Sequence, residues 1–163
     1  MKVNPKKPLY IITDGGILRR KENLVASIRE ALEGAGGGVG FVQLREQVVG
    51  PQAGPFPRAT DDEIIKLIAD IRPICREFDA KIMVNGRADL AQAGGADGVH
   101  LNVYSSGVAD TRKAAGDDFI VGFSAHSIEE VRQASTEGAD YLLCSPVFAP
   151  MSHKSPRPPI GID

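Results

Sequence analysis

Side chains that could take part in chemistry occur as spaced pairs in this sequence. Gln43 and Arg45 are two residues apart, and so are Ser124 and His126. In an extended strand, residues two apart point to the same side. Each pair therefore offers a hydrogen-bonding group beside a charged or basic one, which suits binding of a polar, anionic ligand and, at His126, proton transfer.

Arg45 and His126 each allow two interpretations. A guanidinium on the inner face of a sheet needs a counter-charge. Either a ligand anion or a salt bridge with Glu46 or Asp14 would supply it. His126 precedes Ser127, a helix N-cap candidate, so the positive end of the helix dipole favours a neutral imidazole that could act as a base. The alternative is a hydrogen-bonded surface histidine.

Asn85 and His100 could each have a structural role instead of a functional one. Asn85 is followed by Gly86, and Asn-Gly is also an ordinary turn signal. His100 lies between Val99 and Leu101, which favours a hydrogen-bonded interior histidine over a catalyst. No cluster of His and Cys suggests a metal site, and the two cysteines lack metal or redox spacing.

The elements that position these groups alternate between strand and helix. Strand-like runs are Leu9–Thr13, Val39–Leu44, Lys81–Val84, Gly98–Leu101, Phe119–Phe123 and Tyr141–Leu143. Between them, helical spacing of apolar residues recurs. Such alternation predicts an α/β fold, a TIM-barrel-type (β/α) repeat with about six of the usual eight strands present. Catalytic groups would then gather where the strands end.

Local signals refine the helices. Thr60 with Glu63, and Ser127 with Glu130, match the capping-box pattern at a helix start. Pro73 falls inside a helical stretch and predicts a kink or an early end. The segment Gly-Ala-Asp precedes two strands, at Gly95–Asp97 and Gly138–Asp140, which hints at repeated βα units.

Composition narrows the class of protein. The chain has 163 residues, 42% hydrophobic and 25% charged, with a net charge of −2. We expect one domain, residues 1–163, and no nucleic-acid partner, because a basic footprint is missing. No apolar run is long enough for a signal peptide or membrane span, so we predict a cytoplasmic protein without membrane contact. The Pro-rich segment Gln47–Ala59 is either an ordered lid or disordered.

Short motifs in a common order resemble the thiamin phosphate synthase/TenI superfamily. They are Leu9–Asp14, Val42–Glu46, Val84–Leu90, Gly95–Leu101, Ser124–Ser127, Gly138–Tyr141 and Ser145–Phe148. The resemblance implies a (β/α)₈ barrel that acts on thiamin precursors. The synthase branch of that superfamily joins a pyrimidine diphosphate to a thiazole phosphate using magnesium. The TenI branch includes thiazole tautomerases, which shift a proton on the thiazole precursor.

Departures from the synthase pattern favour the TenI branch. The resemblance implies a synthase lysine two positions after Arg45, where Gln47 stands, and a magnesium-binding Asp after Asn85, where Gly86 stands. A second magnesium Asp would follow the next strand closely, but the next acid is Asp110. Because magnesium needs carboxylate ligands, we expect no cofactor, and magnesium only if the synthase alternative holds.

The sequence therefore favours a TenI-like thiazole tautomerase. His126 would be catalytic, and Gln43, Arg45, Asn85 and Ser124 would bind a thiazole phosphate or a related thiamin precursor. The alternatives are a thiamin phosphate synthase and a non-catalytic member that only binds a ligand.

The strand count also predicts self-association. The resemblance implies a barrel truncated at its C-terminal side. Six strands cannot close it, so the runs Leu9–Thr13 and Tyr141–Leu143 would keep unpaired backbone edges. We therefore expect a homo-oligomer that covers the open side.

Overall fold

The computed structural model describes residues 3–13, 24–46, 59–149 and 158–162. Its parallel strands form a single sheet in sequence order. They are β1 (Leu9–Ile12), β2 (Val39–Leu44), β3 (Lys81–Asn85), β4 (Gly98–Leu101), β5 (Ile120–Ala125) and β6 (Tyr141–Cys144). The helices between them are α1 (Leu24–Gly34), α2 (Asp61–Glu77), α3 (Ala88–Gly94), α4 (Val108–Ala115) and α5 (Ile128–Thr136).

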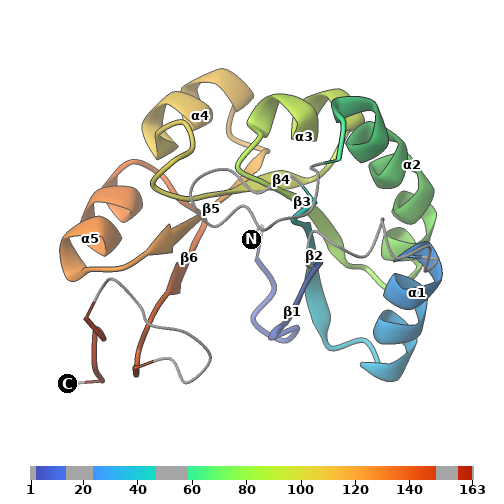
Figure 1. The fold of residues 1–163 in the computed structure, drawn as a ribbon, viewed down its shortest axis with the longest axis horizontal. Coiled ribbons are helices and arrows are strands. Elements are labelled where there is room, and N and C mark those ends of the chain that lie inside the picture. The colour runs from blue at the N-terminus through green and yellow to red at the C-terminus, as the bar shows by residue number, and fades with distance from the viewer. Residues whose placement is uncertain (1–2, 14–23, 47–58, 150–157, 163) are drawn as a thin grey trace.

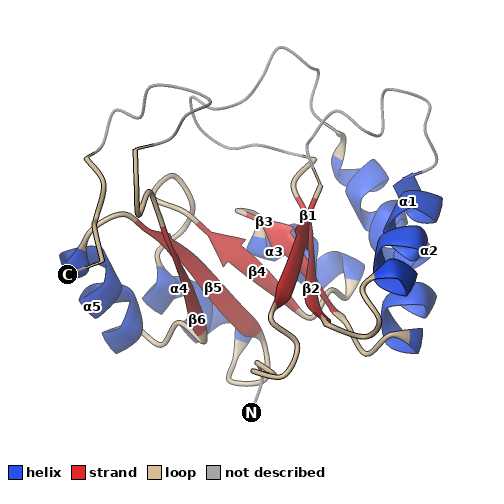
Figure 2. Ribbon diagram, turned by 90° about the horizontal axis from the view of Figure 1, so that it is seen from below, coloured by secondary structure: helices blue, strands red, loops and turns tan. Residues whose placement is uncertain are grey.

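The sheet curls, with the helices along its outer, convex side (Figures 1 and 2). This arrangement confirms the predicted α/β fold, a TIM-barrel-type (β/α) repeat with six strands. The strand bounds shift slightly from the prediction, and two shifts affect the candidate site. Strand β3 includes Asn85, and β5 extends to Ala125, so Ser124 lies inside a strand whereas His126 follows it.

Helix α2 begins at the predicted capping box. The Thr60 hydroxyl accepts the Glu63 N–H, and the Glu63 carboxylate accepts the Thr60 N–H across 2.7 Å. The helix continues through Pro73 to Glu77, so the expected early end is wrong. Proline removes one backbone hydrogen bond. Ile71 and Ile74 on either side of Pro73 are buried in the core, and this packing keeps the turn helical.

Helix α5 has its N-cap at Ser127, as predicted, and the Ser127 hydroxyl accepts the Glu130 N–H across 3.1 Å. The Glu130 carboxylate reaches back to the N–H of His126, 2.6 Å away. The first turn of α5 therefore holds the backbone of His126 directly after β5.

The two faces of the sheet have different contents. The outer face packs apolar side chains such as Val42, Leu44 and Val121 against the helices. Inside the curl, the buried residues Phe41, Met83 and Ile120 form a separate cluster, against which Tyr10 and Tyr141 pack. Strand residues alternate between faces, so residues two positions apart share the inner face. Gln43 and Asn85 therefore lie on this face next to Phe41 and Met83, closer to the C-terminal ends of their strands.

The two Gly-Ala-Asp segments have the same geometry. Asp97 accepts the N–H of Ile82 across 2.9 Å, and Asp140 accepts the N–H of Val121 across 2.8 Å. Each aspartate thus ties the start of its own strand to the start of the preceding one. This equivalence supports the repeated βα unit that the sequence suggested.

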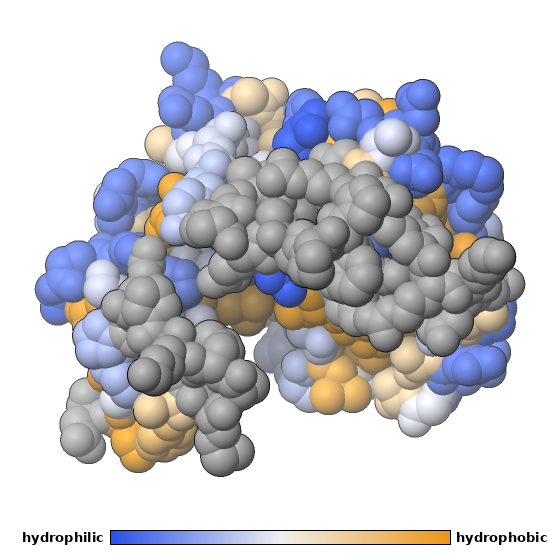
Figure 3. Space-filling view, in the orientation of Figure 1, coloured by the Kyte–Doolittle hydropathy of each residue, from blue (hydrophilic) through white to orange (hydrophobic). Residues whose placement is uncertain are grey.

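The outer strands have ladder partners on one side. Within the described sheet, β1 pairs with β2 alone and β6 pairs with β5 alone. Leu9 and Ile12 on β1 are 50% and 47% exposed. Figure 3 shows apolar surface near β1 and a hollow between it and the C-terminal part of the chain. In the described residues, no helix is long and apolar enough to cross a membrane.

Candidate functional site

The polar side chains chosen from the sequence lie on the inner face of the sheet or just beyond the strand ends. Gln43 is 2% exposed, Asn85 is 6% exposed, and Ser124 is half-buried. They come from β2, β3 and β5, because parallel strands present their carboxyl ends at one edge. The structure joins Gln43 to Asn85, and it joins Ser124 to His100 on β4.

Gln43 and Asn85 form a buried amide pair. The Gln43 Nε2 donates to the Asn85 Oδ1 across 2.9 Å. In the described part of the chain, the Gln43 Oε1 and the Asn85 Nδ2 are buried without a hydrogen-bond partner. Leaving a buried polar group unpaired costs about 1–3 kcal/mol. The pair therefore has one free acceptor and one free donor for a ligand that supplies the complementary atoms.

His100 is an interior histidine with partners on both ring nitrogens, as predicted. Its Nε2 lies 2.8 Å from the Ser124 Oγ and its Nδ1 lies 3.0 Å from the hydroxyl of Tyr141. Burial lowers the pKa of His100 to about 4, so its ring is neutral near pH 7. Tyr141 was missed in the sequence, although it follows the second Gly-Ala-Asp segment as Gly98 follows the first, and Gly98 shares the inner face with His100 two residues later.

His126 contacts the chain beyond β6. Its Nδ1 lies 2.6 Å from the carbonyl oxygen of Ser145. A carbonyl oxygen can only accept, so Nδ1 carries the hydrogen in this contact and the Nε2 of a neutral ring keeps its lone pair. Ser124 and His126 therefore use separate partners. Strand alternation does not extend to His126, because β5 ends at Ala125.

Arg45 is half-buried directly after β2, and its backbone N–H donates to the Thr13 hydroxyl across 2.9 Å. Between the described residues Arg45 and Glu46 there is no ion pair, so that partner proposed from the sequence is wrong. The other one, Asp14, lies outside the described residues, as do Gln47 and most of the segment Gln47–Ala59.

The described residues do not fit a magnesium ion. Gly86 follows β3 without a carboxylate, and the next acid, Asp89, pairs with Arg87 across 2.6 Å. The Arg87 guanidinium lowers the pKa of Asp89. Across the described ranges, no group of three or more His, Cys, Asp and Glu side chains could hold a metal ion.

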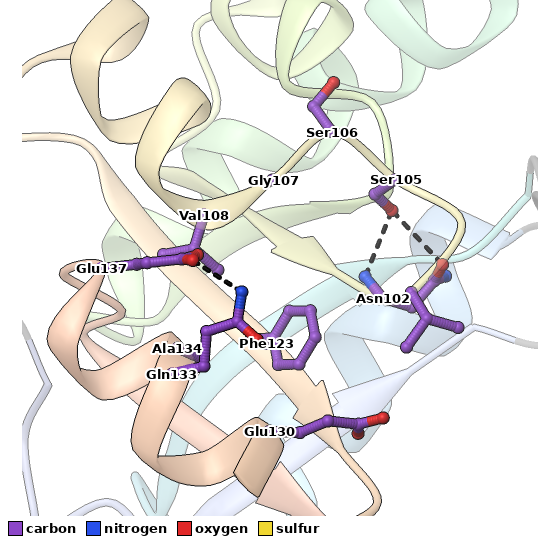
Figure 4. Close-up of a pocket in the computed structure, with 11 residues that line it drawn as sticks. Asn102, Ser105, Ser106, Gly107, Val108, Phe123, Glu130, Gln133, Ala134 and Glu137 are labelled. Carbon is purple, nitrogen blue, oxygen red and sulfur yellow. Dashed lines mark hydrogen bonds between the residues drawn. The ribbon is translucent and has the colours of Figure 1, made fainter.

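A cavity of about 290 Å³ lies on the flank of the sheet (Figure 4). The loop after β4 contributes Asn102 and Ser105, and α5 contributes Glu130. Phe123 on β5 also lines it, and neighbouring strand residues point to opposite faces. The cavity therefore lies on the face of the sheet opposite Ser124, separate from the amide pair.

A curled (β/α) sheet with convergent polar groups at its C-terminal strand ends places the chain in the class of TIM-barrel-type proteins. Within that class, the chain belongs to the thiamine monophosphate synthase family, a family of thiamin biosynthesis, whose model matches residues 9–163.

Individual relatives agree with this assignment. The chain is 38% identical over 156 residues to a protein from Aquifex aeolicus named putative thiamine-phosphate synthase 2, covering 94% of this chain and 74% of the relative. It is 41% identical over 101 residues to a thiamine-phosphate synthase from Caldicellulosiruptor bescii, covering 62% of this chain and 46% of the relative.

A solved structure shares the fold. The chain matches a thiamine phosphate pyrophosphorylase from Pyrococcus furiosus with a TM-score of 0.70 and 36% identity. The match covers 88% of this chain and 62% of that one, so the chain spans less than two thirds of this relative.

Proposed function

We propose that this chain acts in the formation of thiamin phosphate from a pyrimidine diphosphate and a thiazole phosphate. The names of the relatives in A. aeolicus and C. bescii support this activity over the thiazole tautomerase that the sequence favoured. The same names make thiamin precursors the expected ligands.

The amide pair carries this proposal. Gln43 Oε1 can accept one hydrogen bond and Asn85 Nδ2 can donate one, and both atoms are buried. An aminopyrimidine has an amino group beside a ring nitrogen, which supplies one donor and one acceptor. A thiazole ring has an acceptor nitrogen but no N–H donor. The pair therefore suits the pyrimidine half of the product better than the thiazole half.

Other strand-end groups complete the proposed site. Arg45 comes directly after β2, two residues beyond Gln43. Its permanent positive charge suits a phosphate group of the precursor, which a guanidinium can bind through two N–H donors. Ser124 would contribute a hydroxyl to the same ligand.

Calorimetry with an aminopyrimidine phosphate and with a thiazole phosphate tests the proposal. We expect the aminopyrimidine to bind, and Asn85→Ala to weaken its binding about 10- to 100-fold, the loss of one or two buried hydrogen bonds. The matched control is Gln92→Ala, at an exposed amide on α3. Equal aminopyrimidine affinity in both variants would contradict the proposal.

Product formation tests the reaction itself. Thiamin phosphate should form when both substrates are supplied, and parallel assays with magnesium and with EDTA measure whether metal is required. Binding without product would instead support a member that only holds its ligand.

The geometry of His126 favours a second candidate, the TenI-like thiazole tautomerase. The contact between Nδ1 and the Ser145 carbonyl leaves Nε2 available as a proton acceptor. Conversion of a thiazole precursor alone, without the pyrimidine, would support this candidate over the first.

A further inference from the structure

Hydrogen bonds link four side chains across the inside of the curled sheet. The hydroxyls of Tyr10 and Tyr141 lie 2.7 Å apart. The Tyr141 hydroxyl lies 3.0 Å from His100 Nδ1, and His100 Nε2 lies 2.8 Å from the Ser124 Oγ. We call this series of hydrogen bonds the Tyr10–Ser124 relay; it runs from β1 through β6 and β4 to β5.

The relay can be ordered in two directions. His100 is 3% exposed, and burial lowers its pKa to about 4, so the ring is neutral and carries one hydrogen. If that hydrogen is on Nδ1, His100 donates to Tyr141 and accepts from Ser124. If it is on Nε2, His100 accepts from Tyr141 and donates to Ser124.

The two directions differ in which hydroxyl hydrogen has no acceptor within the relay. With the hydrogen on Nδ1, Tyr141 donates to Tyr10, and the Tyr10 hydroxyl hydrogen has no acceptor among the described residues. The rings of Phe41 and Tyr141 lie against Tyr10, and burial raises its pKa. Tyr10 is half-buried between these rings, which disfavours a hydroxyl hydrogen without a protein acceptor there.

With the hydrogen on Nε2, every inner donor has an acceptor. Tyr10 donates to Tyr141, Tyr141 donates to Nδ1, and Nε2 donates to Ser124. The hydrogen left over then belongs to Ser124, which is half-buried beside the strand ends. A ligand can satisfy this hydrogen, whereas nothing described could satisfy it at Tyr10.

We infer that His100 is a positioning residue that fixes the Ser124 hydroxyl as a hydrogen-bond donor to the ligand. The site then selects a ligand with an acceptor at this point, either a ring nitrogen or a phosphate oxygen. The identity of the ligand as a thiamin precursor rests on the function proposed above. The direction of the relay rests on the different surroundings of the Tyr10 and Ser124 hydroxyls and does not depend on that function.

Nitrogen NMR of the ligand-free full chain tests the direction. With ¹⁵N-labelled histidine, and the His100 signals assigned by their loss in His100→Gln, we expect hydrogen on Nε2 and a lone pair on Nδ1 between pH 6 and pH 8. Hydrogen on Nδ1 would overturn the inference, and so would a doubly protonated ring.

Two tyrosine variants test the consequence for binding. Tyr141→Phe removes the donor to Nδ1, so we expect both His100 tautomers and about tenfold weaker binding of an aminopyrimidine phosphate. Tyr104→Phe is the matched control, because Tyr104 is 53% exposed on the loop after β4. Wild-type affinity in a folded Tyr141→Phe protein would overturn the inference. If that variant does not fold, the NMR result on the unmodified chain decides.

Substitution of His100 separates positioning from packing. The amide of His100→Gln can still donate to Ser124, whereas His100→Leu cannot. We expect His100→Gln to retain more affinity than His100→Leu, and equal affinities would contradict positioning. Titrating an aminopyrimidine without phosphate and inorganic phosphate as separate ligands distinguishes the two acceptors.

The experiments distinguish failure of the proposed function from failure of the inference about His100. If no thiamin precursor binds but Nε2 carries the hydrogen, the function is wrong and the direction of the relay stands. If Nδ1 carries it, the inference is wrong whichever ligand binds.

Discussion

The hydroxyls of Tyr10 and Tyr141 lie 2.7 Å apart, which joins the first and last strands of the described sheet. No backbone ladder connects β1 to β6 within that sheet, so side chains make this link. Gly122 on β5 makes room for it, because a Cβ there would lie 2.1 Å from the Tyr141 ring. The inner aromatic cluster thus performs part of the closure that neighbouring strands provide in a complete barrel.

Removing the Tyr10 hydroxyl should weaken this closure. We expect Tyr10→Phe to lower the free energy of unfolding by about 1 kcal/mol, the net value of one hydrogen bond. Urea unfolding measures the change. Tyr104→Phe, on the exposed loop after β4, should stay within about 0.5 kcal/mol of the unmodified chain. Equal stability of both variants would show that the contact contributes nothing.

Burial of His100 predicts a pH dependence of stability. Its pKa is lowered from 6.5 to about 4 in the folded chain, so between these values the unfolded chain binds more protons. The free energy of unfolding therefore rises with pH through this window. At about pH 4, the buried neutral ring of His100 lowers it by about 3 kcal/mol relative to pH 7.

Comparison with His100→Gln isolates this effect from the carboxylates that titrate in the same range. The difference in unfolding free energy between the two proteins should be constant above pH 7 and change steadily between pH 6.5 and pH 4. A pH-independent difference would contradict the lowered pKa.

The sequence predicted the strands closely because alternation of apolar runs and helical patterns is a local signal. It also selected Gln43, Asn85 and Ser124, since residues at the ends of parallel strands meet at one edge. The end of helix α2 was predicted less well. Pro73 is a local helix breaker, but packing of Ile71 and Ile74 outweighs its lost hydrogen bond.

The hydrogen bonds within the site could not be predicted from local sequence patterns. The bond between Gln43 and Asn85 spans 42 positions, and that between Tyr10 and Tyr141 spans 131. Such contacts depend on how far the sheet curls, which no short motif specifies. The expectation that Ser124 and His126 point to the same side of a strand was wrong for a simpler reason, because β5 ends one residue before His126.

The repeated Gly-Ala-Asp unit predicts a structural role for Asp140. Its carboxylate accepts from the Arg112 guanidinium across 2.6 Å and from the Val121 N–H. Asp140→Ala should lower the free energy of unfolding by about 2–3 kcal/mol, since charge-assisted bonds to buried partners are lost. Asp70→Ala is the control, because the exposed pair of Asp70 with Lys66 should contribute less than about 0.5 kcal/mol. Similar losses in a urea titration would contradict this role.

Substitution of His126 tests its proposed role as the base of the tautomerase candidate. If His126 moves a proton in the reaction, His126→Ala should lower kcat about 10²- to 10⁴-fold while the aminopyrimidine or thiazole phosphate still binds. His126→Gln keeps a polar side chain without a basic nitrogen, so it should be equally slow. Steady-state turnover that is unchanged in both variants would exclude His126 as the base.

The open edges of the sheet predict self-association. Strands β1 and β6 each have one side without a strand partner in the described sheet, and Leu9 on β1 is 50% exposed. Free N–H and C=O groups beside apolar side chains favour pairing with another chain. We expect a second copy to cover this side, so that light scattering gives the mass of a dimer or larger oligomer.

A charge placed on the edge tests where the contact lies. Leu9→Lys should shift the mass toward the monomer, because a lysine on an edge strand opposes pairing. Ile128→Lys is the matched control, since Ile128 is 49% exposed but lies on helix α5 and not on an edge strand. Loss of the oligomer in the control alone would place the contact on the helical side. A monomer that melts cooperatively in the unmodified chain would show that the aromatic cluster alone stabilises the open sheet.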